Sequence, residues 1–346
     1  MKLFNSDFKV VMKGYKALKT VCKSEFNRFV IGNGEVILQA PDVELSIVVD
    51  CKNGEEIILD DETIKLLEKC KNDDFEITLD TITAGNKTIE YKSDLKPLSY
   101  LDNSEYKEIG TVTQAELLEA IKGVKYAVAK DEIRPVLTNI LWESSNLVSV
   151  DGCRIITKTV SSNVDMPILI PSVTYTLLEK LLDAKSQDLV KVFLDLDHTA
   201  TRYISFTFGD WMLTTRVGEG EFLNYKQVFS DEFSIEATVD RKSILESLEF
   251  LKQDKNPLKL NVSDERIKMT MVTVNNQIMD EITIDTEVYK LKEPLEIAFN
   301  PKYLIESLKN IKDDTVTLNF VGSSLTPLVI EHTKGKDLIL PVRIKG

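Results

Sequence analysis

The sequence predicts an α+β protein of three tandem domains, each built from two β-α-β-β-β halves. One order of elements recurs three times along the 346 residues: a strand, a helix and three strands, then a second strand–helix–strand unit. The repeat is too long for a solenoid of small units. Each half has one amphipathic helix to cover its strands, so we expect antiparallel sheets outside and helices on a single side. The expected domains are residues 1–106, 107–231 and 232–346.

Capping residues mark the expected helix starts. Ser, Thr, Asp and Asn accept hydrogen bonds from the free N–H groups of a first helical turn. The expected caps are Asp7, Asp60, Thr113, Ser172, Asp240 and Asn300. Thr113 and Glu116 also have the spacing of a capping box, and Pro301 stands at a first helical position, where proline is favoured. The helices are expected over residues 8–23, 62–71, 114–130, 173–185, 241–253 and 302–312.

Short β-rich runs separated by turn residues fill the spaces between these helices. In the first repeat, strands are expected over residues 28–31, 35–39, 45–49, 57–59, 75–79 and 87–91. In the second, they are expected over residues 108–112, 139–142, 147–150, 154–160 and 167–170, with further runs within 190–217. In the third, they are expected over residues 233–239, 258–262, 267–274, 279–284, 295–299, 316–320, 328–332 and 338–342.

The composition is that of a soluble globular protein, with 43% hydrophobic and 29% charged residues. No apolar run approaches the ~20 residues that span a bilayer, and the N-terminus lacks the apolar core of a signal peptide. Four dispersed cysteines without a CxxC pair indicate reduced thiols, so a cytoplasmic protein without a membrane partner is expected. The net charge of −13 argues against coating nucleic acid with the general surface. Binding to a polyanion would need a segregated basic face.

Residues 8–23 provide a candidate for such a face. Lys9, Lys13, Lys16, Lys19 and Lys23 fall within about 120° of arc at about 100° per residue, on a different face from an apolar stripe. An ordinary solvated face is one interpretation. A basic surface in an otherwise acidic chain favours the other, which is contact with a polyanion.

The sharpest enzyme-like signal is an apolar strand that ends in Asp195, followed by Asp197 and Thr199. A DxDxT run presents a nucleophilic aspartate beside Mg²⁺ in phosphohydrolases of the haloacid dehalogenase type. That family needs a parallel sheet, whereas the downstream residues read as strands and turns, so a β-hairpin with an acidic tip is the competing interpretation. The two histidines, His198 and His332, have no neighbouring ligand at metal-binding spacing. The sequence has no P-loop and indicates no catalytic site, metal or cofactor.

Several stretches together resemble the bacterial DNA polymerase III β subunit, the sliding clamp family. In order, they are AVAKDEIRPVLTNILWE, VSVDGCRII, GEGEFLNYKQVF, FNPKYLIESLKNI and LPVRI. The resemblance runs over essentially the whole chain and is strongest from Thr113 onward. It implies the DNA clamp fold, with two chains head to tail in a homodimeric ring, helices lining the hole and sheets outside. The implied function is non-enzymatic: the ring encircles duplex DNA without sequence specificity and gives processivity to a replicative polymerase, after loading by a separate ATPase.

The resemblance also implies roles for particular residues. The expected DNA-contacting residues, with the lysine stripe included, are Lys9, Lys13, Lys16, Arg28, Lys130 and Arg134. Polymerase and clamp-loader peptides would dock in a cleft between the second and third domains, formed by Leu137, Val150, Gly152, Cys153, Arg154, Ile155, Leu340, Pro341, Val342, Arg343 and Ile344. Ring closure would pair Phe250 and Leu251 of one chain with the strand around Ile89 and Tyr91 of the other.

This chain departs from the family pattern at two places near the cleft. Cys153 stands where family members usually have His, and Leu223 stands where they usually have Pro. Two alternatives to the clamp remain: a Mg²⁺-dependent phosphohydrolase using Asp195 and Asp197, and a scaffold that binds peptides but never DNA.

Overall fold

The computed structural model describes residues 1–22, 28–51, 56–70, 74–92, 96, 106–131, 133–195, 202–230, 232–251, 256–273, 275–289 and 293–344. The chain divides into two compact units, the first formed by Met1–Glu119 and Ser161–Gly218, the second by Ala120–Val160 and Glu219–Gly346. Each unit is described by itself. The strand pairs of the described residues are antiparallel, and they confirm the α+β class with antiparallel sheets.

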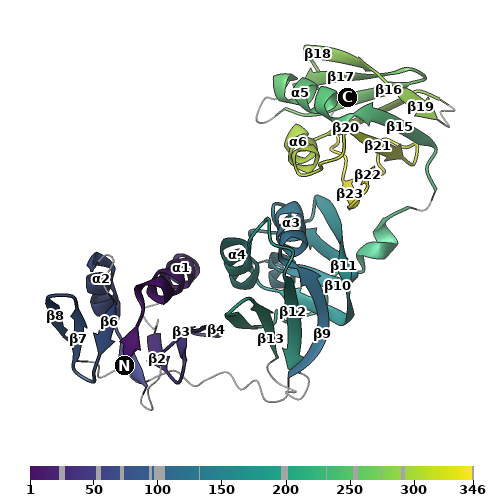
Figure 1. Cartoon of the computed structure of the whole chain (residues 1–346). Coiled ribbons are helices and arrows are strands. Elements are labelled where there is room, and N and C mark those ends of the chain that lie inside the picture. The colour runs from purple at the N-terminus through teal and green to yellow at the C-terminus, as the bar shows by residue number, and fades with distance from the viewer. Residues whose placement is uncertain are drawn as a thin grey trace. The chain divides into compact units, whose positions relative to one another are not determined.

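In its described residues, the first unit contains two sheets and three complete helices (Figure 1). The helices are α1 (Asn5–Val21), α2 (Asp61–Lys69) and α4 (Ser172–Leu181). The larger sheet has the order β5 (Ile57–Leu59), β2 (Arg28–Gly32), β3 (Glu35–Ala40), β4 (Val43–Val48), β14 (Trp211–Arg216), β13 (Tyr203–Phe208), β12 (Leu189–Asp195), β9 (Tyr106–Thr113). The smaller has the order β1 (Lys2–Leu3), β6 (Phe75–Ile77), β7 (Thr81–Ala84), β8 (Lys87–Glu90).

The second unit also contains two sheets, with α5 (Arg241–Leu251) and α6 (Pro301–Lys309) (Figure 1). The larger has the order β10 (Ile140–Val150), β11 (Arg154–Ile170), β23 (Gly335–Ile339), β22 (Leu328–His332), β21 (Thr315–Phe320), β15 (Ile235–Asp240), β19 (Glu287–Tyr289). The smaller has the order β18 (Ile278–Asp285), β17 (Arg266–Val272), β16 (Leu258–Ser263), β20 (Leu295–Phe299). Helix α3 (Gln114–Lys125) and strand β11 contain residues of both units.

Both large sheets join strands from neighbouring sequence repeats. In the first unit, β4 pairs with β14 over five residue pairs, from Trp211 opposite Ile47 to Thr215 opposite Val43. In the second, β11 pairs with β23, with Ile155 opposite Leu338. This pairing gives hydrogen-bond partners to backbone N–H and C=O groups that would otherwise be unpaired at the sheet edge of each repeat.

Helix α1 covers the first of these joints. Its buried apolar residues include Val11 and Leu18, the stripe expected from the sequence. Gly14 lies against the joint itself, because a Cβ there would come within 2.5 Å of the Trp211 ring. Lys13 Nζ donates a 3.0 Å hydrogen bond to the carbonyl of Leu181 at the end of α4, where the helix dipole favours a cation. The absence of a side chain at Gly14 therefore allows the helix to pack closely on the sheet.

Four of the six expected caps are confirmed. Asp60 accepts from Thr63 N at 2.7 Å, Asp240 from Ser243 N at 2.7 Å and Asn300 from Lys302 N at 3.0 Å. Thr113 accepts from Glu116 N at 3.3 Å. The Glu116 carboxylate also accepts from Ser161 N at 2.9 Å.

The other two caps are wrong. The N-cap of α1 is Phe4, and the N–H of Asn5 is bonded by Asp74 at 3.1 Å, so a distant residue takes the role expected for Asp7. Helix α4 already includes Ser172, with Pro171 as its N-cap.

Several boundaries also differ from the sequence prediction. Two expected strands near Trp142 and Leu147 merge into β10, with Ser144 at φ 52° in the middle. The expected final strand over 338–342 is shifted to β23, and β19 was not expected. The positions of Lys23, Lys71, Asp197 and His198 lie outside the described residues. Across the described part of the chain, no helix combines the length and the apolar character needed to cross a membrane.

The packing of Gly14 leads to a stability prediction. Gly14→Ala should lower the free energy of unfolding by about 1–3 kcal/mol, because the new methyl group must displace Trp211. Alanine is otherwise the better helix former by about 1 kcal/mol, so the opposite sign would refute the close approach. Urea unfolding measures the change. Val10→Ala, at an exposed position of the same helix, is the matched control and should change stability little.

Asp61 leads to a pH prediction. Burial raises the pKa of this carboxyl, but hydrogen bonds from Lys19 and Tyr15 outweigh it, and the net pKa is lowered. Because the pKa of Asp61 is lower in the folded than in the unfolded protein, its ionised carboxylate stabilises the fold above the unfolded pKa of ~3.9. This stabilisation is lost as the pH falls through the folded pKa. Asp61→Asn should therefore be less stable than wild type at pH 7, by less than about 1 kcal/mol, since the side chain is 45% exposed.

The stability gap between wild type and Asp61→Asn should close below about pH 4 in urea unfolding across the acid range. Glu62→Gln, in the same first turn of α2, controls for the helix dipole. A gap that persists unchanged at the lowest pH would contradict the assigned cause.

Candidate functional site

A cavity of about 430 Å³ opens in the second unit, beside the joint between β11 and β23. It is lined by Arg134, Val136, Leu137, Val150, Gly152, Arg154, Ile155, Leu223, Val228, Leu338 and Leu340. Six of the eleven expected cleft residues are among them. Cys153, Pro341, Val342, Arg343 and Ile344 are not lining residues.

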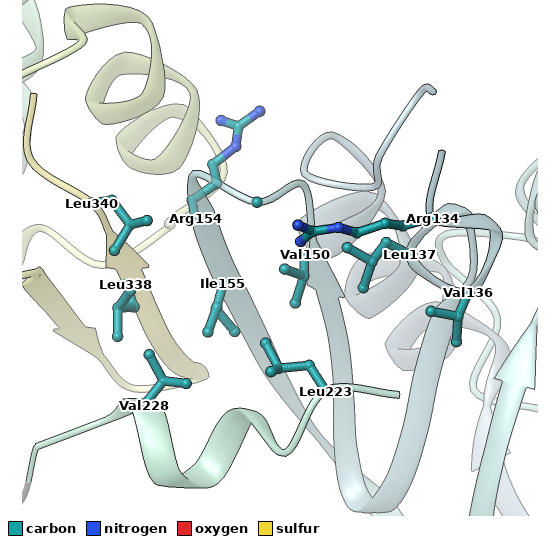
Figure 2. Close-up of a pocket in the computed structure, with 11 residues that line it drawn as sticks. Arg134, Val136, Leu137, Val150, Arg154, Ile155, Leu223, Val228, Leu338 and Leu340 are labelled. Carbon is teal, nitrogen blue, oxygen red and sulfur yellow. The ribbon is translucent and has the colours of Figure 1, made fainter. Parts of the chain in front are cut away.

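Regular secondary structure positions most of the apolar wall. Ile155 and Leu338 are cross-strand partners on β11 and β23, and Val150 ends β10. Two short 3-10 helices add the remaining side: η1 (Pro135–Thr138) and η2 (Tyr225–Val228). Figure 2 shows Ile155, Leu338, Leu223 and Val228 converging on one space, while the Arg154 side chain turns away from them.

Arg154 is held within the protein. Its Nε donates to Asp151 Oδ2 at 2.9 Å, Nη1 lies 2.7 Å from Glu306 Oε2, and Nη2 donates to the carbonyl of Tyr126 at 3.0 Å. Its guanidinium also lies over the rings of Tyr126 and Tyr303. Burial lowers the pKa of Arg154, but the carboxylates of Asp151 and Glu306 outweigh it and keep the group charged. Arg154 therefore anchors the pocket wall to α6 and has few donors left for a ligand.

Arg134 is different, because its side chain is exposed at the rim of the pocket. It has no ion-pair partner among the residues that the structure describes. In Figure 2 its guanidinium extends toward Val150, across the mouth of the cavity. The sequence assigned Arg134 to DNA contact, whereas the structure places it with the pocket residues.

Backbone hydrogen bonds hold the segment after β23 in place. Leu340 N donates to the carbonyl of Cys153 at 2.9 Å, and Val342 N donates to that of Ala298 at 2.8 Å. Cys153 also contacts the Tyr303 hydroxyl, and this hydrogen bond, followed by burial, raises the pKa of Tyr303 to about 12. Leu340 is thereby fixed at the edge of the pocket.

The lysines expected to contact DNA are exposed on α1, at Lys9, Lys13 and Lys16. Acidic residues of α2 lie beside this face: Lys16 pairs with Glu68, and Lys19 pairs with Asp61. Lys130 is exposed, and Arg28 Nε donates to the carbonyl of Lys96 at 3.3 Å. The basic face is therefore partly neutralised within the chain.

The residues expected at a subunit interface are unequally accessible. Phe250 is 77% exposed, but the adjacent Leu251 is 1% exposed and belongs to the core of the second unit. Ile89 is half-buried on β8, whereas Tyr91 is buried and donates to the carbonyl of Thr78 at 2.5 Å. In a single chain, Phe250 and Ile89 are the members of this set that a partner could reach.

Asp195 ends β12, which pairs antiparallel with β9 on one side and with β13 on the other. A haloacid-dehalogenase site needs a parallel sheet, so this arrangement fits the hairpin interpretation and gives no support to the phosphohydrolase. The described residues contain no group of three or more His, Cys, Asp or Glu placed to hold a metal ion.

Four lining residues were missing from the sequence prediction: Val136, Leu223, Val228 and Leu338. Leu338 could have been found, since it alternates with Leu340 in the apolar run near the end of the sequence. The other three lie in or beside the 3-10 helices, which have no periodic signal that separates a pocket residue from a core residue.

Comparisons with known proteins give one consistent result. Family models for the DNA polymerase III beta subunit match at residues 111–224, the central domain, and 226–343, the C-terminal domain. A beta sliding clamp from Synechococcus elongatus is 26% identical over 301 residues, covering 79% of this chain and 77% of the relative. One from Staphylococcus aureus is 24% identical over 355 residues and covers 89% of each chain.

Solved structures show the same fold. A putative DNA polymerase III beta subunit from Eubacterium rectale has a TM-score of 0.81 at 21% identity and covers 99% of this chain and 100% of that chain. A sliding clamp from Bartonella birtlesii, bound to griselimycin, has a TM-score of 0.79 at 18% identity and covers 99% of each. The repeat, the antiparallel sheets and the two family models together show that this chain belongs to the DNA polymerase III beta subunit family, the beta sliding clamps.

Proposed function

We propose that two copies of this chain close head to tail into a ring around duplex DNA and tether a replicative polymerase to it. The apolar pocket beside the β11–β23 joint carries the proposal, because it offers a place where the partner can be held while the DNA slides. The three clamp domains remain as proposed from the sequence, at residues 1–106, 107–231 and 232–346.

The pocket suits a short apolar peptide. Its volume of about 430 Å³ is within the usual range for ligand sites, and its walls are mainly Leu, Val and Ile side chains. Binding of this kind uses a few apolar anchors in a groove. The exposed guanidinium of Arg134 at the rim could then bond a carbonyl or carboxylate of the same peptide. Polymerase and clamp-loader subunits are the proposed partners.

The basic face of α1 suits loose contact with phosphates. Lysines bind the DNA backbone without reading sequence, and such binding weakens steeply with salt. Lys16 and Lys19 already form ion pairs with Glu68 and Asp61. Breaking these pairs costs free energy, which weakens the binding of the lysines to DNA. Weak affinity is compatible with processivity when the link to DNA is topological.

Ring closure is proposed through two open sheet edges. Strand β18 ends the smaller sheet of the second unit and carries exposed Ile278 and Met279. Helix α5, which carries the exposed Phe250, packs against β18. Strand β8 ends the smaller sheet of the first unit and carries Ile89. Edge strands readily accept a further strand.

The proposed ring has no chemistry of its own. With no P-loop in its sequence, loading should depend on a separate ATPase. The proposed location is the cytoplasm, where its dispersed cysteines would remain reduced.

Retention on DNA tests the ring. The protein, loaded by a bacterial clamp loader with ATP, should stay on nicked circular DNA through gel filtration and be lost once the DNA is linearised. Phe250→Asp should be lost from both forms, because a charge at the interface prevents closure. Leu189→Asp, at another exposed position, is the matched control and should behave as wild type. Equal loss of the wild type from circles and linear DNA would refute the ring and favour the peptide-binding scaffold.

The pocket is tested by Ile155→Asp. A charge buried among Leu and Val side chains should weaken peptide binding at least roughly tenfold and reduce polymerase stimulation accordingly. Primer extension by DNA polymerase III on circular DNA measures this, and sedimentation checks that the dimer persists. Leu325→Asp, on an exposed loop of the same unit, is the control. Full stimulation by Ile155→Asp would show that the partner binds elsewhere.

A further inference from the structure

Asp337 on β23 is fully buried and is surrounded by polar side chains. Its Oδ2 accepts from Tyr126 Oη at 3.3 Å and from Ser307 Oγ. Lys158 Nζ and His332 Nε2 lie 3.6 Å and 3.4 Å from Oδ1. We name these five residues the Asp337 cluster. It joins the end of α3, strand β11, helix α6 and strand β22 to β23, and all of its members lie in the second unit.

The cluster is fitted into the core at several points. The Lys158 stem runs against Gly123, where a Cβ would come within 3.0 Å of it, so α3 makes room for this buried lysine. Burial and the charge of Asp337 raise the pKa of Tyr126, which keeps its hydroxyl protonated as a donor. A buried ion pair of this kind contributes little net stability compared with apolar residues of similar volume. Its best-attested use is to fix a register.

The apolar pattern of β23 does not by itself specify the register of this strand. Asp337 is followed by Leu338, Ile339 and Leu340, so an apolar side chain points to either face of the sheet. The β11–β23 ladder has only three residue pairs, in which Ile155 faces Leu338 and Ile156 faces Asp337. Side chains alternate between faces, so a slip by one residue would carry Asp337 to the pocket face and Leu338 away from it. The apolar side chains of β23 would tolerate that slip, which the β22–β23 hairpin, paired over five residues, and the Asp337 cluster both oppose.

From this arrangement we infer that Asp337 is a positioning residue for the pocket, whose buried cluster, together with the β22–β23 hairpin, fixes the register of β23 on β11 and so places Leu338 beside Ile155. The ligand contacts one face of the sheet, and the cluster acts from the other. Thr157 supports the same register, since its Oγ1 accepts from Lys336 N and donates to the Lys336 carbonyl, both at 2.9 Å. The inference rests on the proposed role of the pocket in partner binding.

The test compares Asp337→Leu and Asp337→Asn with Leu260→Ala. Asp337→Leu removes the buried carboxylate that is inferred to fix the register. Asp337→Asn keeps a polar group of the same size, so its amide protection and probe binding should lie between those of Asp337→Leu and wild type. Leu260→Ala opens a cavity in β16 of the smaller sheet and is the control for lost stability. Two quantities are measured well below the melting temperatures: amide hydrogen exchange, and binding of griselimycin as the probe.

Asp337→Leu should lose protection at the amides of residues 154–157 and 335–339 while those of β16 and β17 stay protected, and Leu260→Ala should show the reverse. Probe binding should weaken roughly two- to thirtyfold in Asp337→Leu, the usual range for residues that act through others, and should be unchanged in Leu260→Ala. If Asp337→Leu does not fold, Asp337→Asn decides the test by the same two measurements.

Wild-type exchange and binding in the Asp337 variants would overturn the inference. So would a uniform loss of protection in both sheets, which indicates stability alone. Failure of wild-type protein to bind the probe, with Ile155→Asp as reference, would count against the proposed pocket function, and the exchange measurement would still decide the register.

Discussion

The structure depends on pairing between the open sheet edges of successive sequence repeats. A strand edge exposes a row of backbone donors and acceptors, and unpaired edges invite association with other chains. Here β4 meets β14, and β11 meets β23, so each large sheet continues from one repeat into the next. The helix α1 and the apolar pocket both lie at these joints. Strands β8 and β18 each end one of the two smaller sheets, and these are the edges proposed to close the ring.

Local chemistry predicted the elements well, and tertiary contacts explain where it failed. Asp60, Asp240 and Asn300 cap their helices because an N-cap bond spans only two or three residues. The start of α1 depends instead on Asp74, a residue far along the chain, which no local pattern could reveal. The pairing of β11 with β23 is likewise invisible in periodicity, because it joins segments from different repeats.

The site was predicted mainly by resemblance, and geometry changes parts of it. Ile155 and Leu340 do line the pocket, but Arg134 lies with them although it was assigned to DNA. Phe250 and Leu251 are adjacent on α5, about 100° apart, so one helix face cannot present both to a partner. Leu251 is in the core because it continues the buried stripe of α5 formed by Ile244 and Leu248. The neutralising acids on α2 were also missed, because a lysine stripe does not reveal which carboxylates will fold against it.

The position of β23 between β11 and β22 has a consequence for synthesis. β10 and β11 leave the ribosome long before residues 335–339 do, so an edge of β11 waits unpaired for on the order of ten seconds at ordinary translation rates. During that interval the nascent chain exposes a sheet edge and half of an apolar pocket. A chaperone that shields β11 until β23 emerges would therefore raise the yield of folded protein.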